Sequence, residues 1–263
     1  MYYIGLLKQT LNESKAYRLN FLLSFIVELI PLLGTLFLVK FIYSSGSSFQ
    51  GWDYQSLILY FIIARVSGDI FTPVSWWDIT NDIKYGSLNY HLLKPYSYFF
   101  HNYFVIFSTK IMYLLTSIVV VLLTMYLFIG IPEIEFYWSN LFIYLAYFIL
   151  ASIISYQMTF LLSISAFKFV EIEFIDSIMT FALPILTGVF LPFDIYPNWV
   201  KSILEWLPTS FIAYYPAKLL SSNLFSPNEI LVIFGKMFIW MIIFTIVIKI
   251  MWKKSLKAYE GIG

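Results

Sequence analysis

The sequence has no cysteine, and histidine occurs only twice in its 263 residues. The absence of cysteine excludes disulfides and any thiolate metal site or thiolate nucleophile. Charged residues make up 12% of the chain, against roughly 25% in typical soluble domains. Because the formal net charge is only +1, there is no basic field for nucleic acid, and we expect no nucleic-acid partner.

The motifs of common catalytic sites are also missing. The chain contains no Gly-rich phosphate loop of the form G-x-x-x-x-G-K-[ST], so we expect it not to hydrolyse ATP by itself. His91 and His101 belong to no H-E-x-x-H motif, and no G-x-S-x-G elbow is present. We therefore expect no catalytic residue, no bound metal and no cofactor in this chain.

Long apolar runs dominate what is present, since 60% of the residues are hydrophobic. A membrane-crossing helix needs about 20 mostly apolar residues, and six windows of the chain meet or approach that requirement. The expected spans are residues 20–43, 54–74, 104–129, 140–166, 174–191 and 229–252. The sequence therefore predicts an all-α integral membrane protein with six transmembrane helices, folded as a single transmembrane domain over residues 1–263.

The ends of the spans predict the orientation. In residues 1–18, helical spacing places apolar side chains on one face and mostly basic side chains on another. This pattern predicts an interfacial amphipathic helix before the first span. Cytoplasmic loops carry the excess of Lys and Arg, and most of these residues, with Lys110 counted among them, fall on the side of both termini. The opposite side holds Lys40, Lys201, Lys218 and Lys236. We therefore expect both termini in the cytoplasm.

Residues 78–95, between the second and third spans, predict a cytoplasmic amphipathic helix. Its apolar stripe at helical spacing consists of Ile79, Ile83, Gly86, Tyr90 and Leu93. Asp78, Asn81, Asp82 and Lys84 lie away from that stripe. Two interpretations stay open from the residues alone, namely a surface helix resting on lipid headgroups and a docking helix for a cytoplasmic partner.

Residues 188–208 predict a break at the outer end of the fifth span, because Pro184, Gly188, Pro192, Pro197 and Pro208 interrupt apolar sequence. Irregular backbone at membrane depth requires protein or a water-filled cavity around it. Helical spacing recurs at Ile195, Trp199, Ile203 and Leu207. We expect short outer helices that re-enter the membrane, with an aromatic anchor at headgroup level as the alternative.

Glu28, Arg65 and Asp69 are charged residues inside the first two spans. Each costs about 2.5 to 3.5 kcal/mol at the centre of a membrane helix, so each needs a partner or water. Arg65 and Asp69 are four residues apart and can pair on one face of their helix. The hypothesis is a structural network of all three side chains, with a lining role in a translocation path as the alternative.

Two motifs resemble the membrane subunit of type-2 ABC exporters, in its compact bacterial branch. The first is NDIKYGSLNYHLLKP at residues 81–95, and the second is GVFLPFDIYPNWVKSILEWLP at residues 188–208. With the N-terminal amphipathic helix and the order of the spans, the resemblance covers essentially the whole chain.

The resemblance implies roles for residues already described. Residues 78–95 would be the coupling helix that contacts a separate ATPase subunit, near Asp82, Lys84, Gly86 and Lys94. Residues 188–208 would shape an extracellular gate at Gly188, Pro192, Pro197 and Trp199. Two permease subunits, identical or related, would enclose the pathway in the bacterial cytoplasmic membrane.

The implied partners are two ATPase subunits, which bind the ATP and Mg, the second permease and membrane lipid. Lipids, peptides and drug-like amphiphiles all occur as substrates in this family. The competing function classes are an integral membrane enzyme that processes lipids and an accessory or immunity membrane protein without transport activity.

Overall fold

The computed structural model describes residues 5, 18–46, 49, 51–71, 76–128, 141–167, 181–221, 226–257 and 259. Within these ranges every regular element is a helix and no strand occurs, which confirms the prediction of an all-α protein for this part of the chain. The amphipathic helix expected over residues 1–18 falls almost wholly outside these ranges.

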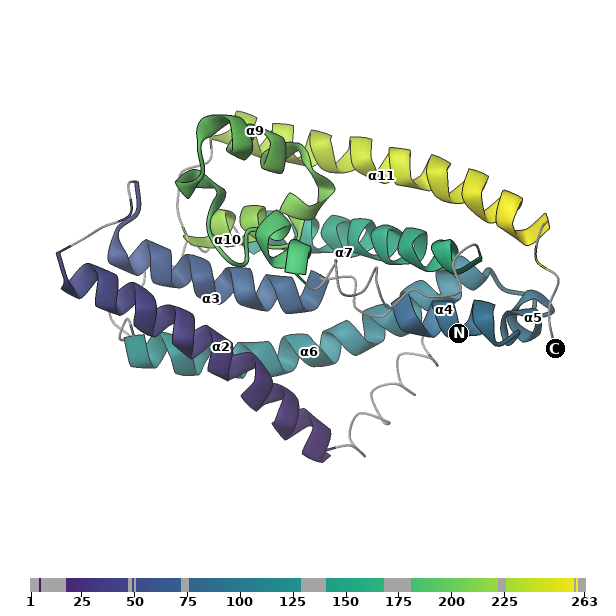
Figure 1. Ribbon diagram of the computed structural model, residues 1–263, viewed down its shortest axis with the longest axis horizontal. Coiled ribbons are helices and arrows are strands. Elements are labelled where there is room, and N and C mark those ends of the chain that lie inside the picture. Colours follow the sequence, from purple (N-terminus) through teal and green to yellow (C-terminus); the bar gives the residue numbers. More distant parts are fainter. Residues whose placement is uncertain are drawn as a thin grey trace.

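Five long helices form the body of the protein, and they coincide with five of the six predicted spans (Figure 1). They are α2 (Arg18–Ser44), α3 (Tyr54–Phe71), α6 (Tyr98–Phe128), α7 (Leu141–Ile164) and α11 (Pro227–Lys257). The structure describes only the last part of the predicted fifth span, where residues 181–187 are helical.

By length and composition, two helices of the described chain can cross a membrane, Phe142–Phe167 and Pro227–Lys257. Leu29–Ser44 and Ser117–Phe128 are shorter apolar helices. Large apolar side chains also remain exposed along α2 and α11, for example Phe41, Leu231 and Ile242. Soluble monomers rarely expose apolar surface over whole helices, so the exposed faces of α2 and α11 suit lipid as their solvent.

The main core forms around α3, which packs against α2, α6 and α10 (Tyr214–Ser221). Every residue of α3 from Leu57 to Ala64 is buried. A helix that is apolar on all sides belongs inside a protein, and α3 accordingly occupies the centre of the helical body. The faces of α2, α6 and α10 that contact α3 therefore line the main core.

A second core, which we call the inner core, lies at the end of the body where α4 (Trp76–Lys84) and α5 (Leu88–Leu92) are found. Its buried members come from α4, α5, α6, α7, α11 and the 3-10 turn η2 (Ser165–Phe167). They are Ile79, Ile83, Leu88, Tyr98, Ile106, Tyr156, Phe160, Ile164, Ala166 and Ile248. The inner core thus fixes the predicted cytoplasmic segment to three long helices.

The single helix expected over residues 78–95 is observed as two short helices, α4 and α5. Gly86 adopts φ +78°, a left-handed conformation that ends α4 and that a residue with Cβ adopts only at a cost. As a result, the expected apolar stripe is split. Ile79 and Ile83 are buried, whereas Tyr90 and Leu93 are exposed.

Candidate functional site

The turn at Gly188 is the first element of the candidate site. Residues 181–187 are helical, and Gly188 then adopts φ +83°, which is the usual way for a helix to end in glycine. A Cβ at this position would lie 2.9 Å from Tyr214 Cβ and 2.9 Å from the Tyr60 hydroxyl oxygen. Only glycine therefore fits the turn, both by backbone conformation and by space.

This turn lies deep against α3. The Tyr60 hydroxyl donates a 2.7 Å hydrogen bond to the carbonyl of Gly188, and a Cβ on Gly68 would lie 2.7 Å from Val189 Cγ2. Gly68 lies about 21 Å along the helix from Tyr54, the first residue of α3, at the usual helical rise. The turn thus reaches well inside the body of the protein.

The polar backbone groups of the turn have protein partners at that depth. Besides the bond from Tyr60, the Thr209 hydroxyl donates to the carbonyl of Leu186 over 2.8 Å, and the amide of Phe190 donates to the carbonyl of Pro184 over 3.0 Å. Backbone without helical hydrogen bonds is tolerated at membrane depth only when protein or trapped water satisfies it. These bonds meet that condition.

Prolines precede both short helices of residues 188–208, which we call the outer segment. Pro192 precedes the 3-10 turn η3 (Phe193–Ile195), and Pro197 precedes α9 (Asn198–Trp206). Proline has no amide hydrogen to leave unsatisfied and a backbone already suited to a helix start. The carbonyl of Pro197 accepts the amides of Val200 and Lys201 at 2.9 and 3.0 Å. The helix α9 lies within the range for which the sequence predicted short outer helices.

An aromatic cluster, formed by Trp52, Tyr60, Phe193 and Tyr214, packs around the turn. Phe193 stacks on Tyr214 with 4.3 Å between ring centroids, and Tyr60 contacts both Trp52 and Tyr214 edge to face. All four side chains are buried. The cluster therefore fills the space beside Gly188 with close-packed rings.

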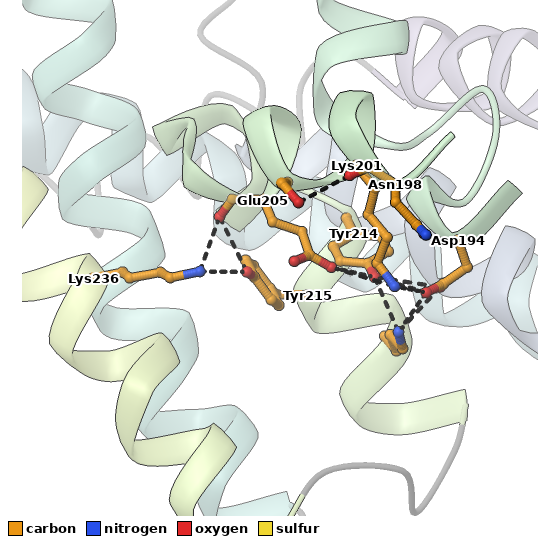
Figure 2. A network of polar contacts seen from close by, with 9 residues as sticks. Asp194, Asn198, Lys201, Glu205, Tyr214, Tyr215 and Lys236 are labelled. Atoms are coloured by element: carbon orange, nitrogen blue, oxygen red, sulfur yellow. Dashed lines mark hydrogen bonds and ion pairs between the residues drawn. The ribbon is translucent and has the colours of Figure 1, made fainter. Parts of the chain in front are cut away.

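Asp194 is the centre of an ion network that joins η3, α9 and α10 (Figure 2). Its Oδ1 lies 2.7 Å from Lys201 Nζ and 2.9 Å from Lys218 Nζ, and the Tyr214 hydroxyl donates to it over 3.3 Å. Burial alone would raise the pKa of Asp194, but the two lysines outweigh burial and hold the pKa below its ordinary value. The carboxylate is thus stabilised in its charged form.

Glu205 extends the network from α9 to α11. Its Oε1 accepts a 3.2 Å hydrogen bond from Tyr214 and lies 3.8 Å from Lys201 Nζ. Its backbone carbonyl accepts bonds from the Tyr215 hydroxyl at 3.1 Å and from Lys236 Nζ at 3.4 Å (Figure 2). The outer segment is therefore tied to α10 by the ion pair of Asp194 with Lys218 and by tyrosine hydroxyls, and to α11 by the hydrogen bond from Lys236 to the carbonyl of Glu205.

The four residues predicted for the gate do not converge on one point. Gly188 and Pro192 lie in the interior, where Pro192 is buried. Pro197 and Trp199 are exposed, with 71% of Trp199 accessible. Trp199 instead shares an outward face of α9 with Ile203 and Trp206.

In the segment of residues 78–95, which the sequence places in the cytoplasm, Asp82 is turned toward its own chain. Its Oδ1 accepts a 2.6 Å bond from Ser87 Oγ, and its Oδ2 accepts a 2.7 Å bond from Tyr98 and lies 3.7 Å from His91 Nε2. Asp82 therefore fixes the turn between α4 and α5 to the start of α6. Asp82 would therefore influence a partner contact indirectly, by setting the position of the turn between α4 and α5.

Lys84 and Lys94, also predicted for the partner contact, are exposed. The Nζ of Lys94 lies 4.4 Å from the centroid of the Tyr90 ring. The neighbouring Tyr85 and Leu93 are 78% and 87% exposed. The tip of the segment thus presents two lysines around large apolar side chains.

Of the predicted intramembrane network, the structure describes one pair. Arg65 Nε lies 3.1 Å from Asp69 Oδ2, one turn along α3, while the side chain of Glu28 lies outside the described residues. Lys110, which the sequence placed among the inner ends of the spans, lies within α6 and its Nζ contacts Ser155 Oγ at 3.4 Å.

Taken together, the helical body, the exposed apolar helices and the reversing segment define a membrane-embedded protein. Within the described ranges, no three His, Asp or Glu side chains gather as a metal site would require. No curated protein matches the chain at a significant level. The family model described as ABC-2 family transporter protein matches residues 29–263, and the chain belongs to that family.

This membership confirms the resemblance to type-2 ABC permeases, and the chain is a transmembrane permease of an ABC transporter. Members of the family form the membrane component of the transporter and are not themselves catalytic. They generally work with an ABC ATPase partner.

Proposed function

We propose that this chain is the permease subunit of an ATP-driven exporter, with six membrane spans and both termini in the cytoplasm. In this arrangement α2, α3, α6, α7 and α11 are five spans, and the helix that ends at Gly188 belongs to the remaining one. The location is the bacterial cytoplasmic membrane. A second permease, identical or related, completes the pathway.

The observation that carries the proposal is the anchoring of α4 and α5. Ile79, Ile83 and Leu88 are buried in the inner core against α7 and α11, whereas Tyr85, Leu93 and the two lysines are exposed. An exposed apolar tip rimmed by polar groups is typical of a protein contact. We assign this tip to the ATPase subunit, of which two copies bind the ATP and Mg.

Movement of the ATPase would reach the spans through the inner core, because a close-packed core transmits displacement instead of absorbing it. At the other end, the turn at Gly188 and the aromatic cluster would form the gate. Hydrolysis in the partner would thus alternate the exposure of a pathway for an amphiphilic substrate, such as a lipid, a peptide or a drug-like molecule.

The test begins with purification of the tagged chain from its native host in mild detergent, followed by mass analysis and an ATPase assay. We expect a stoichiometric ATPase and a second permease subunit in the complex. The isolated chain without any ATPase, even after gentle crosslinking, would favour a lipid-processing enzyme or an accessory protein instead.

Charge reversal then tests the contact itself. Lys84→Glu and Lys94→Glu are expected to lower ATPase stimulation several-fold while the chain remains in the membrane. Lys249→Glu is the matched control, because Lys249 is an exposed lysine of α11 outside the segment. Unchanged stimulation in both variants would contradict a contact at this tip.

A further inference from the structure

Lys236 has an environment that the proposed function does not use. Its Nζ donates to the carbonyl of Glu205 at 3.4 Å and to the Tyr215 hydroxyl at 3.3 Å. It also lies 5.3 Å from the centroid of the Trp206 ring and 5.9 Å from that of Tyr215. These partners from the described chain are all uncharged, so none of them is a counter-ion for the ammonium (Figure 2).

The position of Lys236 along α11 places it near a membrane boundary. The helix has 31 residues, or about 46 Å, which exceeds the hydrocarbon thickness of about 30 Å. Lys253 and Lys254 near its C-terminal end mark one membrane surface. Lys236 lies about 26 Å from Lys253 along the axis, which is close to the opposite boundary.

Aromatic side chains surround the lysine at this level. Trp240 donates its indole N–H to the carbonyl of Trp206 over 2.8 Å, which holds α9 against α11. Trp206 is 54% exposed, and Ile203 and Trp199 continue its outward face along α9. Tryptophan is the residue type enriched at the lipid headgroup level.

An apolar track leads from Lys236 into the membrane. Ile239 and Ile243 follow Lys236 at helical spacing on α11, and both are exposed. This track is continuous with the exposed apolar face of the same helix, which is one of those able to cross a membrane. The site therefore combines a cation at headgroup level, aromatic walls and a path for an acyl chain.

We propose that Lys236, with Trp206 and Trp240, binds the phosphate headgroup of a phospholipid in the leaflet opposite the C-terminal lysines. The phosphate contacts the ammonium of Lys236, and an acyl chain lies over Ile239 and Ile243. A lipid bound here is in direct contact with α9 and reaches the ion network around Asp194 through Glu205. The proposal needs α11 to lie in a membrane, and it does not depend on export or on an ATPase.

The test measures the thermal unfolding midpoint of the full chain in detergent during titration with dioleoyl phosphatidylglycerol. Dioleoylglycerol, which has the same acyl chains without phosphate, and inorganic phosphate are titrated separately. We expect the phospholipid to raise the midpoint and the other two compounds to leave it unchanged. Stabilisation by dioleoylglycerol to the same degree would show that the site is an apolar surface only. Stabilisation by inorganic phosphate would show that it is a site for a free anion. Either result overturns the proposal.

Substitutions at single residues test whether the phospholipid binds at Lys236. Lys236→Gln is expected to raise the half-saturating lipid concentration at least about fivefold, the factor expected for one lysine at an anionic lipid surface. Lys236→Arg keeps the charge and should retain most of the effect. Lys249→Gln is the control on the same helix and should titrate as the unaltered protein does. If Lys236→Gln and the unaltered protein have the same half-saturating concentration, the phosphate does not bind at Lys236.

If Lys236→Gln does not yield folded protein, Trp206→Ala replaces it, because the carbonyl of Trp206 that accepts from Trp240 remains in that variant. Weaker phospholipid binding is expected for Trp206→Ala, and an unchanged titration curve would overturn the proposal.

Discussion

The hydroxyl of Tyr60 on α3 donates a 2.7 Å hydrogen bond to the carbonyl of Gly188, at the turn where the chain reverses. Tyr60 is fully buried, so the bond joins the centre of the core to the one point where the helix over residues 181–187 stops. This bond ties the turn at Gly188 directly to α3, beside the hydrogen bond from Thr209 to Leu186 and the rings of the aromatic cluster.

Tyr60→Phe is expected to lower the free energy of unfolding by about 1 to 3 kcal/mol, because a buried carbonyl loses its hydrogen-bond donor. Denaturation of the purified chain measures this change. Tyr54→Phe is the control, since the Tyr54 hydroxyl makes a longer 3.4 Å contact with Phe128 and is only partly buried. Equal losses in the two variants would argue against a special role for the bond to Gly188.

Gly188→Ala is expected to destabilise the fold by about 2 to 5 kcal/mol. The left-handed backbone costs about 1 to 2 kcal/mol for a residue with Cβ, and overpacking a core adds about 1 to 3 kcal/mol. Gly46→Ala provides the control, because Gly46 has φ +80° and nothing lies within 4 Å of its added Cβ. The difference between the two variants isolates the contact with Tyr60 and Tyr214.

Asp194→Asn is expected to cost about 1 to 3 kcal/mol at neutral pH, since Lys201 and Lys218 lose their charged hydrogen-bond acceptor. The pKa of Asp194 is lowered in the folded protein, so its contribution is present above the ordinary Asp pKa of about 3.9 and is lost as the pH falls below that value. Unfolding curves at several pH values should therefore converge for the two proteins in acid. A constant gap down to the lowest pH would contradict this assignment.

Tyr98→Phe is expected to weaken coupling to the ATPase more than it weakens membrane insertion. The variant removes the 2.7 Å bond that Tyr98 donates to Asp82, which frees the turn between α4 and α5. Tyr85→Phe serves as the comparison, because Tyr85 is 78% exposed and its hydroxyl is not part of the bonds around Asp82. ATPase stimulation measured in the assembled complex compares the two variants. Equal stimulation by Tyr98→Phe and Tyr85→Phe would show that the bond from Tyr98 to Asp82 is not part of the coupling.

Apolar length predicted the long helices well. The expected range 140–166 contains α7, and the range 229–252 lies inside α11, because a run of apolar residues with few charges has few other stable conformations in lipid. Proline and glycine likewise indicated the break at Gly188, and helical spacing from Ile195 to Leu207 indicated the short helix that is observed as α9. These signals are local, and the sequence displays them directly.

What the sequence did not predict depends on contacts between distant residues. Tyr214 and Lys218 are one helical turn apart on α10, but Asp194 meets them only after η3 and α10 fold over one another, and no spacing in the chain links it to them. Gly86 was assigned to a helical stripe because its neighbours fit the period, although its positive φ ends that helix. Asp82 was expected at a partner surface, whereas three side chains of its own segment and of α6 surround it.

One long helix touches both ends of the molecule. Near one end of α11, Lys236 and Trp240 contact the outer segment, and near the other, Trp252 stacks on Tyr98 at 5.7 Å between ring centroids. Between them, Gln157 of α7 donates to Thr245 over 2.8 Å and to the carbonyl of Met241 over 3.2 Å, so α11 is also held near its middle. A tilt of about 10° about that point would move each contact by roughly 2 Å in opposite directions, given the helical rise. Because α11 is one continuous helix, a displacement of one of its ends also changes the position of the other.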